Sequence, residues 1–93
     1  MDYGKAVTVI RTAKNLTQKE LAELLGKTPS YISRVENNER TPSVEFVNLL
    51  CERLKVPVTL FMLLGKNYEQ MDEMDRHLLD EMGARLLEII TKS

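Results

Sequence analysis

The fold is decided by residues 16–37, which read LTQKELAELLGKTPSYISRVEN. Thr17 and Glu20 have the spacing of a capping box, in which each side chain bonds to the backbone amide of the other residue. Six residues after Glu20 comes Gly26, which suits the left-handed conformation that often ends a helix. The stretch therefore predicts a helix that begins after Thr17 and stops at Gly26.

A second helix start follows this glycine almost at once. Thr28 is a candidate N-cap, and Pro29 fits the first helical position because the amide hydrogen it lacks has no helical partner there. Ile32 and Val35, three residues apart, give this short helix its inward face. Two short helices joined by a tight glycine turn, with Ala22 small enough for a close crossing, predict a helix-turn-helix unit.

Helical spacing continues on both sides of this unit. Residues 3–14 carry apolar side chains at helical intervals behind Asp2, a suitable N-cap. Ser43 is expected to cap a fourth helix. Thr59 is expected to cap a short apolar fifth helix that ends at Gly65.

From about residue 68 to residue 91 the sequence has the pattern of one more amphipathic helix. Its apolar stripe is too long to stay exposed on a small protein, so we expect it to form a dimer or partner interface together with the fifth helix. An alternative is that the stripe folds back over residues 3–64 and completes a monomeric core. The residues assigned to the interface are Leu60, Phe61, Leu64, Met71, Met74, Leu78, Met82, Leu86 and Ile89.

Length and composition limit the possible functions. With 93 residues, one His, one Cys and no Trp, the chain has few ways to build a metal site or a Ser–His–Asp triad. We therefore expect no enzyme activity, no cofactor and no metal.

The longest apolar run is Leu60 to Leu64 and no secretory leader is recognisable, so we expect a cytoplasmic protein without membrane contact. Nine basic and seven acidic residues in 1–56 leave that part mildly basic, whereas 57–93 is acidic.

The central motif closely resembles that of the Xre family, the lambda-repressor-like Cro/cI type of bacterial and phage regulators. The resemblance covers about residues 3–64. It rests on the capping box and on residue types at fixed offsets: Ala22, Gly26, Ile32, Val35, Pro42 and Ser43. One departure is Asn38, where the family often has Gly, but Asn tolerates the positive φ that the position needs. The resemblance implies an all-α protein with a five-helix lambda-repressor-like DNA-binding domain in residues 1–65. To this domain the apolar pattern of the sequence adds a C-terminal amphipathic helix in residues 66–93.

The third helix is expected to enter the major groove of double-stranded DNA, where its side chains can reach base edges. Arg34 is the strongest candidate for a base contact, because its guanidinium can bind guanine O6 and N7 together. Ser30 and Ser33 can each form a hydrogen bond, and Pro29 can contact a thymine methyl group. In the family, the residues that match Thr28, Pro29, Ser30 and Arg34 lie in the base-reading surface. Most of these side chains are short, so DNA shape is expected to contribute to specificity.

Other residues are expected to hold the DNA backbone. Gln18 lies in the first turn of the second helix, where free amides point outward, and the matching family glutamine clamps the backbone. By resemblance, Arg11 and Glu36 pair across the first and third helices and brace the reading helix, with Arg11 also near phosphate. The remaining phosphate-binding candidates lie at or beside the same surface: Lys19, Lys27, Tyr31, Asn37 and Arg40.

The leading prediction is a sequence-specific transcriptional regulator, a repressor, that binds an inverted-repeat operator as a homodimer. The alternative is an antitoxin-type protein-binding module, whose C-terminal helix docks a toxin-like partner while DNA binding regulates its own operon. These two functions can coexist in one protein. A third version, a controller of restriction–modification genes, is not distinguished by any residue.

Overall fold

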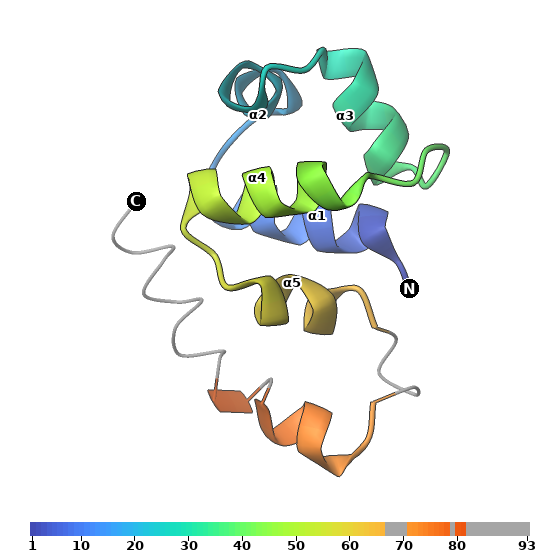
Figure 1. Ribbon diagram of the computed structural model, residues 1–93, viewed down its shortest axis with the longest axis vertical. Coiled ribbons are helices and arrows are strands. Elements are labelled where there is room, and N and C mark those ends of the chain that lie inside the picture. The colour runs from blue at the N-terminus through green and yellow to red at the C-terminus, as the bar shows by residue number, and fades with distance from the viewer. Residues whose placement is uncertain (67–70, 79, 82–93) are drawn as a thin grey trace.

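The computed structural model describes residues 1–66, 71–78 and 80–81, and within these ranges the regular structure is entirely helical. In chain order the helices are α1 (Tyr3–Ala13), α2 (Gln18–Leu25), α3 (Pro29–Glu36), α4 (Val44–Leu54) and α5 (Val58–Leu64). Residues 73–78 and 80–81 are also helical. In Figure 1, α2 and α3 lie together at one end, α1 and α4 cross the middle, and α5 separates them from the orange helical residues. The predicted all-α arrangement is confirmed.

Side-chain caps fix where the first four helices begin. In the capping box of α2, the Glu20 amide donates to Thr17 Oγ1 at 3.0 Å and the Thr17 amide donates to Glu20 Oε1 at 2.9 Å. The bond from the Thr17 amide lowers the pKa of the Glu20 carboxyl. Gly26 ends α2 with φ 65°, as predicted. The cap residues are Asp2, Thr17, Thr28 and Ser43.

One apolar core lies between these helices. α3 contacts both α1 and α2, while α4 contacts α2 and α5, so α3 is packed from more than one side. Cys51 of α4 belongs to the core, and its burial raises the pKa of the thiol. The largest fully buried side chains are Phe46, Phe61, Ile10, Leu21, Ile32, Leu50, Leu60, Val7 and Val35.

The fifth helix corrects part of the predicted dimer interface. Leu60 and Phe61 are only 2% and 0% exposed, because α5 packs against both α1 and α4. The Phe61 ring lies 6.4 Å from the ring of Tyr3, measured between centroids. These two residues are therefore core residues, and Leu64 is half-buried. The helix also begins at Val58, one residue before the predicted cap.

The last predicted helix starts later than its apolar pattern indicates. Met71 and Asp72 are not helical, and Asp72 Oδ1 accepts a hydrogen bond from the Asp75 amide at 2.7 Å, so it caps a helix that begins at residue 73 rather than 68. Met71 is buried, so it too is unavailable to a second chain. Lys66 Nζ lies 2.7 Å from Asp75 Oδ2, a contact that raises the pKa of Lys66 and lowers that of Asp75. Outside the described residues lie Met82, Leu86 and Ile89.

The start of α1 lies directly against the end of α3. The Gly4 amide donates to Asn38 Oδ1 at 3.0 Å, and Asn38 Nδ2 donates to Asp2 Oδ1 at 2.9 Å. The Lys5 amide and Asn38 together lower the pKa of Asp2. Asn38 has the expected positive φ, 59°, and its side chain adds contacts that a glycine could not make. A Cβ on Gly4 would lie 2.8 Å from Asn38 Oδ1 and from the carbonyl carbon of Glu36, so a larger residue has no room.

Gly4→Ala is expected to lower the free energy of unfolding by about 1–3 kcal/mol, because overpacking forces the backbone to shift. The sign is opposite to the gain of about 1 kcal/mol that this change gives at an uncrowded helical position. Gly26→Ala is the comparison, since its Cβ would meet nothing within 4 Å and its cost of about 1–2 kcal/mol comes from positive φ alone. Urea denaturation measures both changes. A Gly4→Ala protein as stable as the parent would contradict the close approach of α1 to α3.

Candidate nucleic-acid interface

α2 and α3 meet at a short, fixed turn. The Lys27 amide donates to the Ala22 carbonyl, five residues earlier in the chain, at 2.9 Å. This hydrogen bond closes around Gly26 and is typical of a helix that ends at a glycine. Ala22 is 1% exposed at the crossing of the two helices, and Ile32 and Val35 are fully buried. The side of α3 that faces the core is therefore held rigidly. This is the helix-turn-helix geometry that the sequence predicts.

The opposite side of α3 faces solvent. Helical spacing from the buried Ile32 places Ser33 and Arg34 toward this side, where Arg34 is exposed and Ser33 is half-buried. Asn37 Nδ2 lies 3.5 Å from Ser33 Oγ, so Asn37, predicted to bind phosphate, shares this surface. We call this surface the reading face. It is formed by residues predicted to contact bases: Thr28, Pro29, Ser30, Ser33 and Arg34.

One flank of the reading face is held by an ion pair. Arg11 Nε donates to Glu36 Oε2 at 2.6 Å and Arg11 Nη2 donates to Glu36 Oε1 at 3.1 Å, which joins α1 to the end of α3. The two side chains are only 15% and 6% exposed. Gln18 Nε2 also donates to Glu36 Oε1, at 3.0 Å, so α2 joins the same carboxylate. The structure thus contains the pair that the family resemblance implies, with Gln18 as a third member.

This network changes what Arg11 and Gln18 can offer to DNA. Each of the three guanidinium nitrogens of Arg11 donates a hydrogen bond inside the protein, the third to the Leu16 carbonyl at 2.7 Å. A phosphate contact by Arg11 or Gln18 would have to use the N–H groups that remain. Their phosphate role stays a prediction. Sequence reasoning missed the bond from Gln18 to Glu36, since it depends on how α2 crosses α3.

The other flank carries an aromatic ring with two cations. The Tyr31 ring packs on Phe46 of α4, with 5.4 Å between centroids. Lys27 Nζ lies 5.3 Å and Arg40 Cζ lies 5.1 Å from the centroid of the Tyr31 ring. Three of the predicted phosphate-binding residues therefore form one cluster, although no spacing in the sequence indicates it. Lys19 is exposed at the start of α2.

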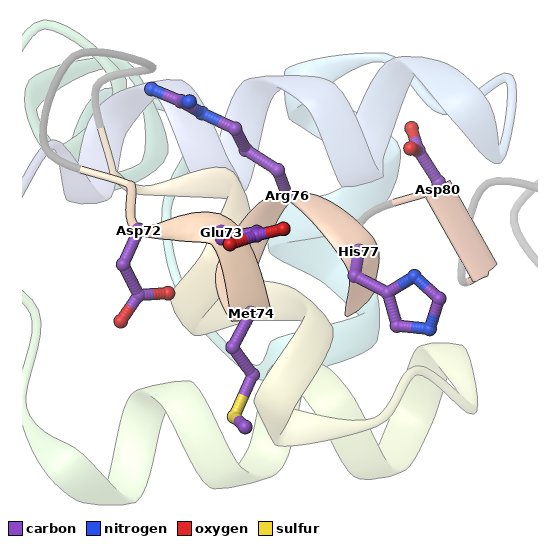
Figure 2. Close-up of a pocket in the computed structure, with 6 residues that line it drawn as sticks. All are labelled: Asp72, Glu73, Met74, Arg76, His77 and Asp80. Atoms are coloured by element: carbon purple, nitrogen blue, oxygen red, sulfur yellow. The ribbon is translucent and has the colours of Figure 1, made fainter.

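A separate hollow of about 740 Å³ lies on the helical residues near the end of the described chain (Figure 2). It is lined by Asp72, Glu73, Met74, Arg76, His77 and Asp80. The labelled side chains in Figure 2 point in different directions, and no metal-binding group of His, Cys, Asp or Glu occurs among the described residues. Among all the described residues, no helix is long and apolar enough to cross a membrane. With three carboxylates in its lining, the hollow is unsuited to DNA.

Glu36→Ala should lower the free energy of unfolding by about 2–3 kcal/mol, because it leaves a mostly buried guanidinium without its partner. Glu36→Gln should recover part of this loss, since an amide oxygen still accepts a hydrogen bond. Glu23→Ala, at an exposed position on α2, is the control and should change stability by less than about 0.5 kcal/mol. Urea denaturation of all three proteins is the measurement. Equal stability of the Glu36→Ala and Glu23→Ala proteins would contradict a stabilising role of the Arg11–Glu36 pair.

Comparison with known proteins agrees with this geometry. A helix-turn-helix family model matches residues 9–61, from within α1 to within α5. Antitoxin PezA of Streptococcus pneumoniae is 27% identical over 88 residues, which cover 90% of this chain and 56% of that protein. The competence pilus inhibition repressor of Acinetobacter baylyi is 30% identical over 69 residues, which cover 74% of this chain and 63% of that protein.

The chain thus spans less than two thirds of either relative. The family match, in contrast, covers more than half of the chain and includes the whole of the α2–turn–α3 unit, the reading face and both flanks. The protein belongs to the Xre-type helix-turn-helix family of DNA-binding domains.

Proposed function

We propose that the protein is a repressor that binds a specific double-stranded DNA operator through α3. The observation that carries the proposal is the contrast between the two sides of this helix: Ile32 and Val35 are fully buried, whereas the opposite face is polar and open to solvent. The core fixes the buried side of this helix, and the solvent-exposed side carries mostly short polar side chains. Such a helix fits the major groove. The relative named as a repressor supports this function.

Base reading is assigned mainly to Arg34. Its side chain is exposed, and among the described residues no carboxylate lies within ion-pair distance of it. The guanidinium is therefore available for a bidentate contact with guanine. Lys19 is also exposed and unpaired in that part of the chain, and it is assigned to the phosphate backbone. Affinity that rests on such contacts falls as salt concentration rises.

A homodimer on an inverted repeat is the second part of the proposal. Two reading helices one DNA turn apart, about 34 Å, would double the number of base contacts. Several apolar side chains remain exposed: Val58 and Met62 on α5 at 44% each, Met74 at 71% and Leu78 at 37%. Each pair is four residues apart and so lies on one face of its helix. These residues, with the extension formed by residues 66–93, are the proposed contact with a second chain.

An antitoxin role is the second candidate, favoured by the match of antitoxin PezA to 90% of this chain. In that case residues 66–93 would dock a toxin-like protein, and α3 would regulate the operon that encodes both. A stable complex with the product of a neighbouring gene, formed without DNA, would support this function. In either role the protein would act in the cytoplasm.

Arg34→Ala should weaken binding to the best operator by about 1–3 kcal/mol and relax the preference at one base position. Lys19→Ala is the matched comparison: it should weaken binding to all sequences alike and reduce the salt slope by about 0.9. Selection from random-sequence DNA with each purified protein gives the sequence preference, and titrations at several salt concentrations give the slope. If the preference selected by the Arg34→Ala protein equals that of the parent, Arg34 does not read a base.

The double change Met74→Glu and Leu78→Glu should convert a two-chain particle into a single chain, because charges would be buried at the proposed contact. Operator binding should fall while helicity is retained. Val44→Glu is the control, since Val44 is 73% exposed on α4 and lies outside the proposed contact. Light scattering at micromolar concentration measures the mass. A parent protein with the mass of one chain, or a double variant that keeps the mass of two, would contradict this interface.

A further inference from the structure

We infer that Tyr31 is a positioning residue, whose ring holds Lys27 and Arg40 in place for phosphates on one side of the DNA groove. The inference rests on the proposed DNA-binding function and assigns a role within it. Tyr31 acts here through the two cations rather than by a base contact of its own. The observations that carry it are the packing of the ring, the positions of the two cations and the lack of a carboxylate beside them in the described part of the chain.

The Tyr31 ring is itself fixed by the core. It lies against Phe46 with 5.4 Å between centroids and 58° between ring planes, and Phe46 is only 2% exposed. The backbone of Tyr31 is fixed as well, since its amide donates to Thr28 Oγ1 at 3.1 Å in the cap of α3. The contact with Phe46 and the capped backbone both restrict the orientations open to this ring. It can therefore serve as a rigid platform beside the reading face.

The two cations reach this platform from opposite ends of α3. Lys27 lies in the turn before the helix, where its amide donates to the Ala22 carbonyl at 2.9 Å. Arg40 lies in the loop after the helix, where its amide donates to the Arg34 carbonyl at 3.3 Å. Both side chains are long, and ordering them costs conformational entropy. Each cationic group lies within 6 Å of the ring centroid, the range in which the π face attracts it.

The positive charge of this cluster is not neutralised by the described part of the protein. No carboxylate of those residues lies within ion-pair distance of Lys27 or Arg40. Arg11, on the other flank of α3, is in contrast paired with Glu36 at 2.6 Å. Neither cation has a carboxylate of the described residues as a partner, so each can bind an anion from another molecule. The phosphates that border the major groove are the anions that this flank would meet.

Positioning of this kind should increase affinity without changing which sequence is read. Side chains that are already ordered lose less freedom when DNA binds, so more of the contact energy is kept as affinity. Phosphate contacts carry no direct sequence information, so the gain should be the same for the operator and for random DNA. A role of Tyr31 in aiming the reading face would instead change the preferred sequence. The two roles are therefore separable by experiment.

The test is a mutant cycle on the full chain with operator and random-sequence DNA as probes. Tyr31→Leu keeps an apolar contact with Phe46 but removes the ring, and it should weaken binding to both probes by the same factor, roughly three- to tenfold. Tyr31→Phe keeps the ring and should restore most of that loss. The pair Lys27→Ala and Arg40→Ala should reduce the salt slope by about 1.8, since each phosphate contact contributes about 0.9. Added to that pair, Tyr31→Leu should have no further effect.

The outcomes separate the inference from the proposed function. If the parent protein binds neither probe at low salt, the DNA-binding function itself is wrong, and the inference falls with it. If the parent binds, but Tyr31→Leu weakens binding as much without the two cations as with them, only the positioning role is rejected. A changed sequence preference in Tyr31→Leu also rejects it. Binding losses that disappear in the absence of the cations support it.

A spectroscopic measurement on the parent protein does not depend on the folding of any variant. Protons of the Lys27 and Arg40 side chains that lie over the Tyr31 ring should show upfield ring-current shifts in NMR spectra. If the chemical shifts of these protons equal those of a disordered chain, the two side chains do not lie over the Tyr31 ring. The inference is then rejected, whatever the results for the variants. Thermal melts of each variant establish that binding is compared among folded proteins.

Discussion

The carboxylate of Glu36 is the point on which the rest of the structure depends. It receives hydrogen bonds from Arg11 of α1 and from Gln18 of α2, and it stands at the last residue of α3, so three helices meet at one acidic side chain. Close by, Gly4 allows α1 to approach the same helix end, which Asn38 then ties to the start of α1. With the buried side of α3 added, these contacts leave the reading helix little freedom to tilt or rotate.

Under the proposed function, stability and recognition are supplied by different sides of one short helix. An isolated helix of eight residues would be only marginally ordered in water, so α3 owes its order to packing and to its cap. The polar reading face contributes little to folding and is free to be used for binding. Its two flanks differ in character. On the side of α1 and α2 lies a neutralised ion pair, and on the side of α4 lies a cationic cluster that has no carboxylate of the described residues within ion-pair distance. Under the proposed function, this division gives the interface a rigid frame and leaves the positive charge of the cluster for the DNA backbone.

The C-terminal part shows what a pattern of apolar residues does not specify. Leu60 and Phe61 belong to an apolar run that the sequence predicts to contact a second chain, yet α1 and α4 cover them, and they complete the core. Met71 is likewise buried, while Met74 and Leu78 on the following helix remain exposed. Helical periodicity records which residues share a face, but the partner of that face is set by the tertiary arrangement. The surface left for another protein is consequently different from the one that periodicity alone indicates.

The sequence by itself determined the helix boundaries around the motif, because caps and turns are local. Thr17 with Glu20, Gly26, Thr28 with Pro29, and Ser43 each act on backbone groups within a few residues, so their geometry follows from spacing. The family resemblance also supplied the pairing of Arg11 with Glu36. Tertiary structure alone decided the bond from Gln18 to Glu36, the burial of α5, and the meeting of Lys27, Tyr31 and Arg40. These contacts join residues on different elements, which meet only when the helices pack against each other. The geometry of that packing depends on the whole core.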